Sequence, residues 1–398
     1  MAAAWRRDWA SVVAAVARVT RDLDAAQDAA QEAFGSAVTH WAEHGVPDNP
    51  AAWLTTTARR KALDALRRGR ALRDRLPLLV VPDPAGTGPG PPEDDRLRLV
   101  FTCCHPALAP AARVALTLRL VCGLPTADVA ALFLVPEATM AARLTRAKRR
   151  IRATGIPYRV PSDAELGSRL PAVLAVVSLL NTAGHTARHG PLLVDTTAVA
   201  EALRLARLLA LLMPDEPEVH GLLALLLLSD AHRDARVDAD GELVLLADQD
   251  RTRWDRAAIA EGTALTRRFL ARTGRPGRYL LQAAIAAVHA EAPGADATDW
   301  PRVVTLYDAL LRVDPSPGTA LARAIAVGAA HGPWAGLAAV DALAGDPALA
   351  GYHRLPAARA TLLERAGRTG EARAAYRLAA ALATNDLERR HLTRRAEA

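Results

Sequence analysis

Six basic residues lie within residues 143–152, where their charge could bind a nucleic acid. The apolar residues around them recur at spacings of four, three and four, which predicts a helix with one apolar stripe. That stripe consists of Met140, Leu144, Ala147 and Ile151. The residues predicted to face away from it or to flank it are Thr139, Ala142, Arg143, Arg146, Arg149 and Arg150. Because arginine binds guanine edges and phosphates, this face suits the major groove of DNA.

The element that must position these arginines is a helix-turn-helix over residues 124–152. Thr126 is a suitable N-cap for a first helix that runs through Phe133. Leu134, Val135 and Pro136 make a tight turn, and Pro136 suits the first position of the second helix. An ordinary helical hairpin with a solvated basic face remains the alternative, but the short turn and the local charge favour DNA binding.

An acidic stripe is expected on an earlier helix, from about residue 22 to residue 41. Asp24, Asp28 and Glu32 lie four residues apart and therefore share one face. Such a stripe could bind a basic protein surface, or it could be a solvated helix face.

A basic helix is expected over residues 51–73. It combines Trp53 with Arg59, Arg60, Lys61 and Arg67. An aromatic ring beside basic side chains suits single-stranded nucleic acid, in which bases stack and cations hold the backbone. A structural role for Trp53 in the core is the alternative.

The net charge of +7 is unevenly distributed along the 398 residues. Residues 59–75 hold eight bases and two acids, and residues 96–160 hold eleven bases and two acids. Residues 161–398 hold 27 bases and 28 acids. The basic surplus is confined to two patches of the first 160 residues, as is typical of a protein that binds nucleic acid.

The remaining segments predict a helical protein with a long C-terminal region. Residues 76–95 are rich in proline and glycine and predict a flexible linker. From residue 160 to residue 398, helical periodicity is broken every 15–25 residues by glycine or proline, as in stacked helical hairpins. A polar segment interrupts this region and either braces the fold or forms an interface. Its residues are Asp240, Asp248, Asp250, Arg251, Arg253 and Trp254.

Several classes of protein are disfavoured. No apolar run is long enough to cross a bilayer, so we expect a cytoplasmic protein without membrane contact. Cys103 and Cys104 have no second ligand pair nearby, so we expect buried thiols and no metal. The sequence has no arrangement of a nucleophile and a base and no glycine loop for phosphates. We therefore expect neither an enzyme nor a cofactor.

In combination, these segments resemble an extracytoplasmic-function RNA polymerase sigma factor. The resemblance rests on DLDAAQDAAQEAF, NPAAWLTTTARRKALDALRR and LPTADVAALFLVPEATMAARLTRAKRRIR. Later segments, such as RVDADGELVLLADQDRTRWDRAAIAEG, are similar to a subgroup with a tetratricopeptide-like C-terminal extension. The resemblance implies an all-α fold of four parts. These are region 2 (1–75), a linker (76–95), a helix-turn-helix region 4 (96–157) and the helical extension (160–398).

The resemblance also implies a role for each set of residues. Asp24, Asp28 and Glu32 would bind core RNA polymerase. The minus-ten promoter element would be bound by Val46, Asn49, Trp53, Arg59, Arg60, Lys61, Asp64 and Arg67. The minus-thirty-five element would be bound by Pro136, Glu137, Thr139, Ala142, Arg143, Arg146, Arg149 and Arg150. The extension would regulate activity, with a small YCII-related protein as its partner.

Two other functions remain open. The first is a free-standing helix-turn-helix regulator that acts without polymerase. The second is a DNA-binding module fused to an enzyme or to a metabolite sensor in the C-terminal half. Binding to core polymerase separates the first from a sigma factor, and a ligand screen addresses the second.

Overall fold

The computed structural model describes residues 2–73, 95–133, 135–156, 158–159, 163–185 and 196–398. The fold class predicted from the sequence is confirmed, because the described residues form 18 α-helices and no strand. The chain divides into two compact units, residues 1–180 and 181–398. The predicted linker, residues 76–95, lies outside the described residues except for Asp95, which begins a helix.

The first unit begins with three helices that pack on one another: α1 (Ala2–Thr20), α2 (Leu23–His44) and α3 (Pro50–Arg73). The Asp22 carboxylate caps α2 by accepting hydrogen bonds from the backbone amides of Asp24 and Ala25. Alanines recur on the buried side of α2, and the aromatic rings of Phe34 and Trp41 pack beside them. Small residues on this side let α1 and α3 approach α2 closely, so the acidic face is left outward.

Four shorter helices follow in the same unit: α4 (Asp95–Cys103), α5 (Pro110–Leu120), α6 (Thr126–Leu132) and α7 (Glu137–Ala153). Helix α5 packs on α4, α6 and α7, and α1 packs on α4. Cys103 and Cys104 are buried as predicted, and burial raises the pKa of the Cys104 thiol to about 12. The unit ends within α8 (Asp163–His185).

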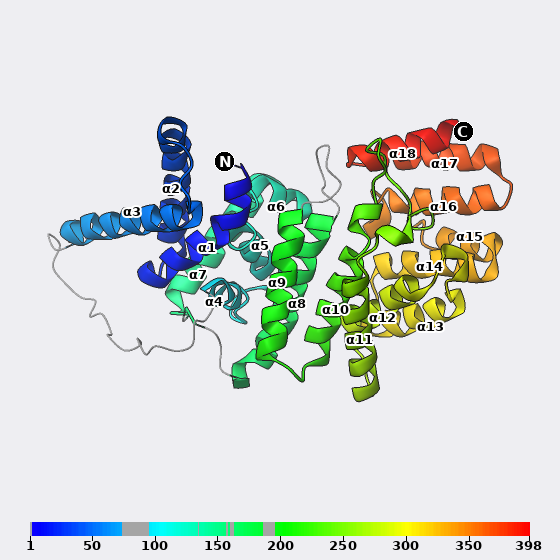
Figure 1. The fold of residues 1–398 in the computed structure, drawn as a ribbon, viewed down its shortest axis with the longest axis horizontal. Coiled ribbons are helices and arrows are strands. Elements are labelled where there is room, and N and C mark those ends of the chain that lie inside the picture. The colour runs from blue at the N-terminus through cyan, green and yellow to red at the C-terminus, as the bar shows by residue number, and fades with distance from the viewer. Residues whose placement is uncertain (1, 74–94, 134, 157, 160–162, 186–195) are drawn as a thin grey trace. The chain divides into compact units, whose positions relative to one another are not determined.

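The second unit is a succession of helices that pack mostly on their neighbours along the chain, except that α10 packs most extensively on α12 (Figure 1). Its helices are α9 (Thr196–Leu212), α10 (Pro217–Asp230), α11 (Arg256–Arg272), α12 (Arg278–Glu291), α13 (Trp300–Val313), α14 (Pro317–His331), α15 (Pro333–Asp341), α16 (Arg354–Arg365), α17 (Thr369–Leu382) and α18 (Asp386–Glu397). Four 3₁₀ turns lie between them, at Arg233–Ala235, Arg251–Arg253, Ala295–Ala297 and Pro347–Leu349.

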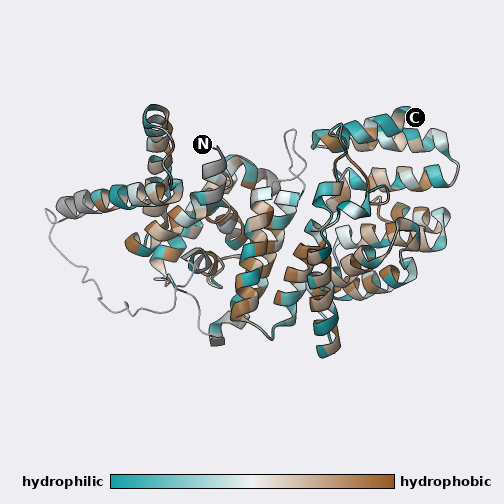
Figure 2. Cartoon of the chain, viewed as in Figure 1, coloured by the Kyte–Doolittle hydropathy of each residue, from teal (hydrophilic) through white to brown (hydrophobic). Residues whose placement is uncertain are grey.

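The last three helices pack in order, α16 on α17 and α17 on α18. Helices α16 and α17 pack as a pair whose shared core includes Leu363 and Tyr376. Helix α18 adds only Leu387, Leu392 and Ala396 as buried residues, and Figure 2 shows it largely in the hydrophilic colour. Helix α18 thus covers part of α17 and presents a mostly polar outer side.

Candidate nucleic-acid interface

Helix α7 buries the stripe that its sequence predicts. Met140, Leu144, Ala147 and Ile151 are all less than 9% exposed, and the helix packs on α5 and α6. Three predicted boundaries are displaced by one residue, and one of them is the end of α6, which lies at Leu132 rather than Phe133. Pro136 precedes the first residue of α7, Glu137, rather than beginning the helix. Thr126 is the first residue of α6 rather than its cap. Such shifts are within the ordinary uncertainty of helix ends.

The outer face of α7 carries free cationic side chains. Arg146, Arg149 and Arg150 are exposed, and none of them makes an ion pair with another described residue. Pro136, Glu137, Thr139 and Ala142 are exposed on the same helix. Arg143 is half-buried, with its guanidinium carbon 5.3 Å from the centroid of the Phe133 ring. This face can therefore contact an anionic partner without first breaking an internal salt bridge.

Two other cations of α7 point to the acidic helix α2. Lys148 Nζ lies 3.0 Å from Asp24 Oδ1 and donates to Gln27 Oε1 at 2.7 Å. Arg152 Nη2 binds Asp22 Oδ2 at 2.8 Å and Asp24 Oδ2 at 2.9 Å. Burial alone would raise the pKa of the Asp22 carboxyl, but the hydrogen bond and charge of Arg152 hold it below its ordinary value. The cations of α7 thus form two sets, one free and one bound to α2.

The acidic stripe is only partly covered by these contacts. Asp24 is bound to α7, whereas Glu32 meets Lys61 of α3, with 3.5 Å between Oε2 and Nζ. Asp28 is exposed. The pKa of Asp28 is raised by partial burial and by the nearby charges of Asp24 and Glu32. The stripe is therefore bound by α7 at Asp24 and by α3 at Glu32, and Asp28 between them is left exposed.

An aromatic cluster joins α1 to the turn that precedes the helix-turn-helix. Trp5 and Trp9 stack with ring centroids 4.2 Å apart, and Trp5 Nε1 donates to the Gly123 carbonyl oxygen at 3.3 Å. Gly123 has a φ of +67°, and a Cβ added there would lie 2.8 Å from Trp9 Cδ1. Farther along, the Tyr158 hydroxyl donates to the Ala14 carbonyl oxygen at 3.0 Å. Helix α1 is thus tied to residues on both sides of α6 and α7.

The residues expected to bind single-stranded DNA lie at the start of α3 and along it. Val46 and Asn49 are exposed before the helix, and Asn49 Oδ1 accepts a hydrogen bond from the Ala52 amide at 3.0 Å. Trp53 is half-buried, and its ring stacks at 5.3 Å from His40, which is exposed. One face of Trp53 is thus occupied within α2 and α3, as the core alternative would require.

The basic residues of α3 differ in exposure. Arg60 is exposed, Arg59, Lys61 and Asp64 are half-buried, and the side chain of Arg67 lies outside the described residues. The Arg59 Nε is buried without a hydrogen-bond partner among the described residues. Among the cations of α3 whose side chains are described, Arg60 is therefore the most accessible to a phosphate.

The polar segment of the second unit contributes mostly to internal contacts. Trp254 is 5% exposed, and the Arg251 guanidinium lies 4.5 Å from its ring centroid. Arg251 also donates to the carbonyl oxygens of His289 and Ala292 at 2.9 and 2.6 Å. Asp250 caps a 3₁₀ turn. These contacts fit the alternative in which the segment braces the fold. Asp240, Asp248 and Arg253 are exposed and stay candidates for an interface.

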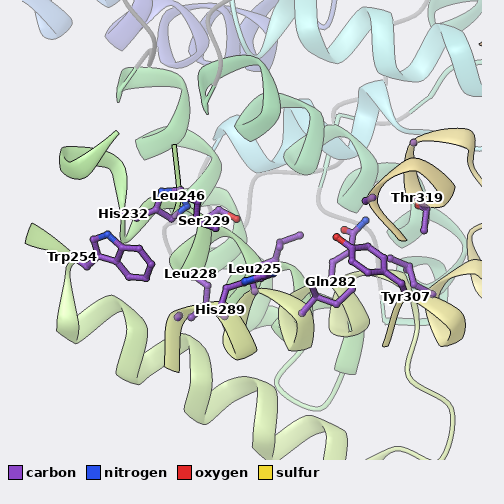
Figure 3. Close-up of a pocket in the computed structure, with 16 residues that line it drawn as sticks. Leu225, Leu228, Ser229, His232, Leu246, Trp254, Gln282, His289, Tyr307 and Thr319 are labelled. Carbon is purple, nitrogen blue, oxygen red and sulfur yellow. The ribbon is translucent and has the colours of Figure 1, made fainter. Parts of the chain in front are cut away.

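The second unit contains a cavity that was not predicted from the sequence (Figure 3). Its walls come from four helices and from the polar segment, and only Trp254 among its residues had been singled out. No local motif marks it, because its residues are spread from Leu225 to Ala322.

The described residues hold neither a cluster of metal ligands nor a helix that could span a membrane. Within that part of the chain, no three His, Cys, Asp or Glu side chains are grouped so as to hold a metal ion. No helix there is both long enough and apolar enough to span a membrane.

Comparison with known proteins assigns families to three parts of the chain. Residues 6–72 match Sigma-70 region 2, and residues 98–151 match Sigma-70 region 4. Residues 169–270 match a family of unknown function, DUF6596. An uncharacterised protein of Rhizobium meliloti (strain 1021) is 43% identical over 383 residues, which cover 94% of this chain and 90% of that protein. No solved structure matches the chain.

Proposed function

The chain is an RNA polymerase sigma factor that belongs to the same family as the Rhizobium meliloti protein, and we propose that α2, α3 and α7 divide its work. Helix α2 binds core polymerase through Asp24, Asp28 and Glu32. The start of α3 and the loop before it bind the minus-ten element. The outer face of α7 binds the minus-thirty-five element.

One observation carries this proposal: the cations of α7 are separated into a free set and a bound set. Arg146, Arg149 and Arg150 are exposed without an internal counter-ion among the described residues, on the face opposite the buried stripe. That is the arrangement a recognition helix needs, because phosphates and guanine edges then meet guanidinium groups that need not be released first. Val46, Asn49, Trp53 and Arg60 would act on the second element, where a stacked base and its phosphate need a ring and a cation.

The bound set supports a closed form of the free protein. Lys148 and Arg152 neutralise the Asp24 end of the acidic stripe, which is the end proposed for polymerase. Polymerase binding then exchanges these two cations for basic side chains of polymerase, and α7 is released to reach its promoter element. The DNA-binding helix α7 and the polymerase-binding stripe of α2 are in this way held together until polymerase separates them.

The C-terminal helices belong to a finer part of the proposal. We place the chain in the extracytoplasmic-function group with a tetratricopeptide-like extension, on the basis of its region 2 and region 4 matches and of the succession of helices that follows them. In this proposal the extension regulates activity, and a YCII-related small protein is its partner. A factor that acts on polymerase works in the cytoplasm.

The test is transcription by purified core polymerase with the full-length chain. We expect the chain to bind core and to give run-off transcripts from its own promoter, on intact and on pre-melted templates. The variant Asp28→Lys/Glu32→Lys should bind core more weakly. The variant Asp215→Lys/Glu371→Lys, altered at exposed positions of the second unit, is its charge-matched control. A chain that binds promoter DNA but never core polymerase would instead be the free-standing regulator.

A further inference from the structure

The second unit has a partly open cavity of about 400 Å³. Its walls are α10, α12, α13 and α14, and the segment after α10 closes one end with Leu246 and Trp254. The volume lies within the range of cavities that hold small molecules. Every lining residue belongs to the second unit, so the cavity does not depend on how the two units are placed.

None of the sixteen residues that line the cavity is an aspartate, glutamate, lysine or arginine. Its two histidines are neutral at neutral pH. Burial lowers the pKa of His232 to about 4, with help from His185 and Arg236, and burial beside Arg251 lowers that of His289. A charged ligand would lose its hydration here without gaining a counter-ion, and that loss is costly. The cavity therefore selects an uncharged ligand.

The end of the cavity at α12 and α13 presents unused polar groups. Neither the Gln282 amide nor the Tyr307 hydroxyl makes a hydrogen bond to a described residue. Both lie at the same end in Figure 3, together with Thr319 in the first turn of α14. Polar groups that face a cavity without protein partners favour a ligand that can hydrogen-bond to them.

The opposite end is aromatic. The rings of His232 and Trp254 lie 5.6 Å apart, and Figure 3 shows both at the end away from Gln282. Their Nδ1 and Nε1 atoms are buried without a hydrogen-bond partner among the described residues. Leu225 and Leu228 lie between the two ends. An apolar middle with a ring-lined end suits a flat ring system.

We propose that this cavity is a binding site for an uncharged, ring-containing small molecule. Its ring lies next to Trp254 and His232, and a hydrogen-bonding group meets Gln282 and Tyr307. The site does not depend on the sigma function, since all its contacts lie in α10–α14 and the segment after α10.

The experiment titrates full-length protein with two dyes that fluoresce when they leave water. N-phenyl-1-naphthylamine is uncharged and carries an N–H group, whereas 8-anilinonaphthalene-1-sulfonate has a similar ring system and a negative charge. We expect saturable binding of the neutral dye at one site per chain. The anionic dye should neither share that site nor displace the neutral dye.

Three variants locate the binding. Ala322→Phe fills the cavity from α14, and Gln282→Leu removes the polar group at nearly constant volume. Ile325→Phe adds a ring to the same helix at an exposed position outside the cavity and is the control. We expect Ala322→Phe to weaken the affinity at least about tenfold and Gln282→Leu a few-fold, with Ile325→Phe unchanged.

Thermal unfolding by circular dichroism checks that each variant is folded. If Ala322→Phe does not fold, Gln282→Leu decides on its own. The proposal is overturned if the neutral dye shows no saturable binding. It is equally overturned if binding is insensitive to every folded cavity variant, or if the anionic dye binds the same site as tightly.

Discussion

Lys148 Nζ lies 3.0 Å from Asp24 Oδ1, which joins the helix expected to read DNA to the helix expected to bind polymerase. Only 12% of the Lys148 side chain is exposed, and Gln27 accepts a second hydrogen bond from the same ammonium group. Arg152 adds bonds to Asp22 and Asp24. Because the contact covers one end of the acidic stripe, the proposed binding to polymerase would compete with these ion pairs for the same carboxylates.

Removing the cations that close the stripe should strengthen polymerase binding. For Lys148→Ala/Arg152→Ala we expect an affinity for core polymerase roughly two- to tenfold higher, because the energy of breaking these partly exposed pairs is no longer required. Fluorescence energy transfer between dyes on α2 and α7 should fall in the same variant.

The control removes the same charge from the other face of α7. Arg149→Ala/Arg150→Ala should leave both the energy transfer and the affinity for core unchanged, since neither arginine is paired. Equal behaviour of the two double variants would contradict the closed form.

Gly123 should be a sensitive position of the first unit. Its φ of +67° disfavours any side chain, and a Cβ would press on the Trp9 ring at 2.8 Å. We expect Gly123→Ala to lower the free energy of unfolding by roughly 1–3 kcal/mol, measured with a chemical denaturant.

Gly35 is the matched position within α2, where an added Cβ meets no atom within 4 Å. Gly35→Ala should raise the free energy of unfolding by about 0.5–1 kcal/mol, because alanine favours the helix. If both variants lower the free energy of unfolding by the same amount, the contact with Trp9 is not the cause of the destabilisation at position 123.

Single arginines on the outer face of α7 should carry promoter affinity. Arg146→Ala should weaken binding of minus-thirty-five DNA by about 1–3 kcal/mol if the side chain reads a base. If the side chain contacts a phosphate instead, the loss of affinity should be similar on all DNA sequences. The salt dependence of binding should then also be weaker.

Arg377→Ala, at an exposed position of α17, removes the same charge without touching α7. The affinities of the two variants for DNA are compared by fluorescence anisotropy at several salt concentrations. An Arg146→Ala protein that binds as tightly as the Arg377→Ala protein would exclude Arg146 from the interface.

Acid should destabilise the second unit through His232. Its pKa in the folded protein is about 4, compared with an ordinary value of 6.5. Between these values the unfolded chain takes up a proton that the folded chain does not, so the free energy of unfolding falls as the pH falls from 6.5 to 4. We expect a loss of roughly 1–3 kcal/mol over this window.

Denaturant unfolding at pH about 7 and about 5 measures this loss. His232→Gln should reduce the pH dependence, whereas His331→Gln, at an exposed position, should not. The assignment fails if His232→Gln and the unaltered protein show the same difference between the two conditions.

Local patterns predicted the helices well and their mutual contacts poorly. The stripe of α7 could be read from Met140 to Ile151, because a helix repeats over a few residues and one buried face selects its residue types. The roles given to the promoter-binding residues stay predictions.

The bonds of α7 to α2 could not be predicted, because Lys148 and Gln27 are 121 residues apart and each occurs in an ordinary polar pattern. Trp254 illustrates the same limit. Its polar neighbours left open whether the segment braces the fold or forms an interface, and the buried ring favours the brace. The cavity beside it is built from residues of four helices, whose positions relative to one another cannot be predicted from any short segment.

The ties between α1 and the residues after it have a consequence for synthesis on the ribosome. The partners of Trp5 and Ala14 lie 118 and 144 residues later in the chain. Helices α1, α2 and α3 therefore leave the exit tunnel well before α7 and Tyr158 can reach them, and domains begin to fold in that order. For that interval the acidic face of the nascent chain is uncovered, and its closure coincides with completion of the helix-turn-helix.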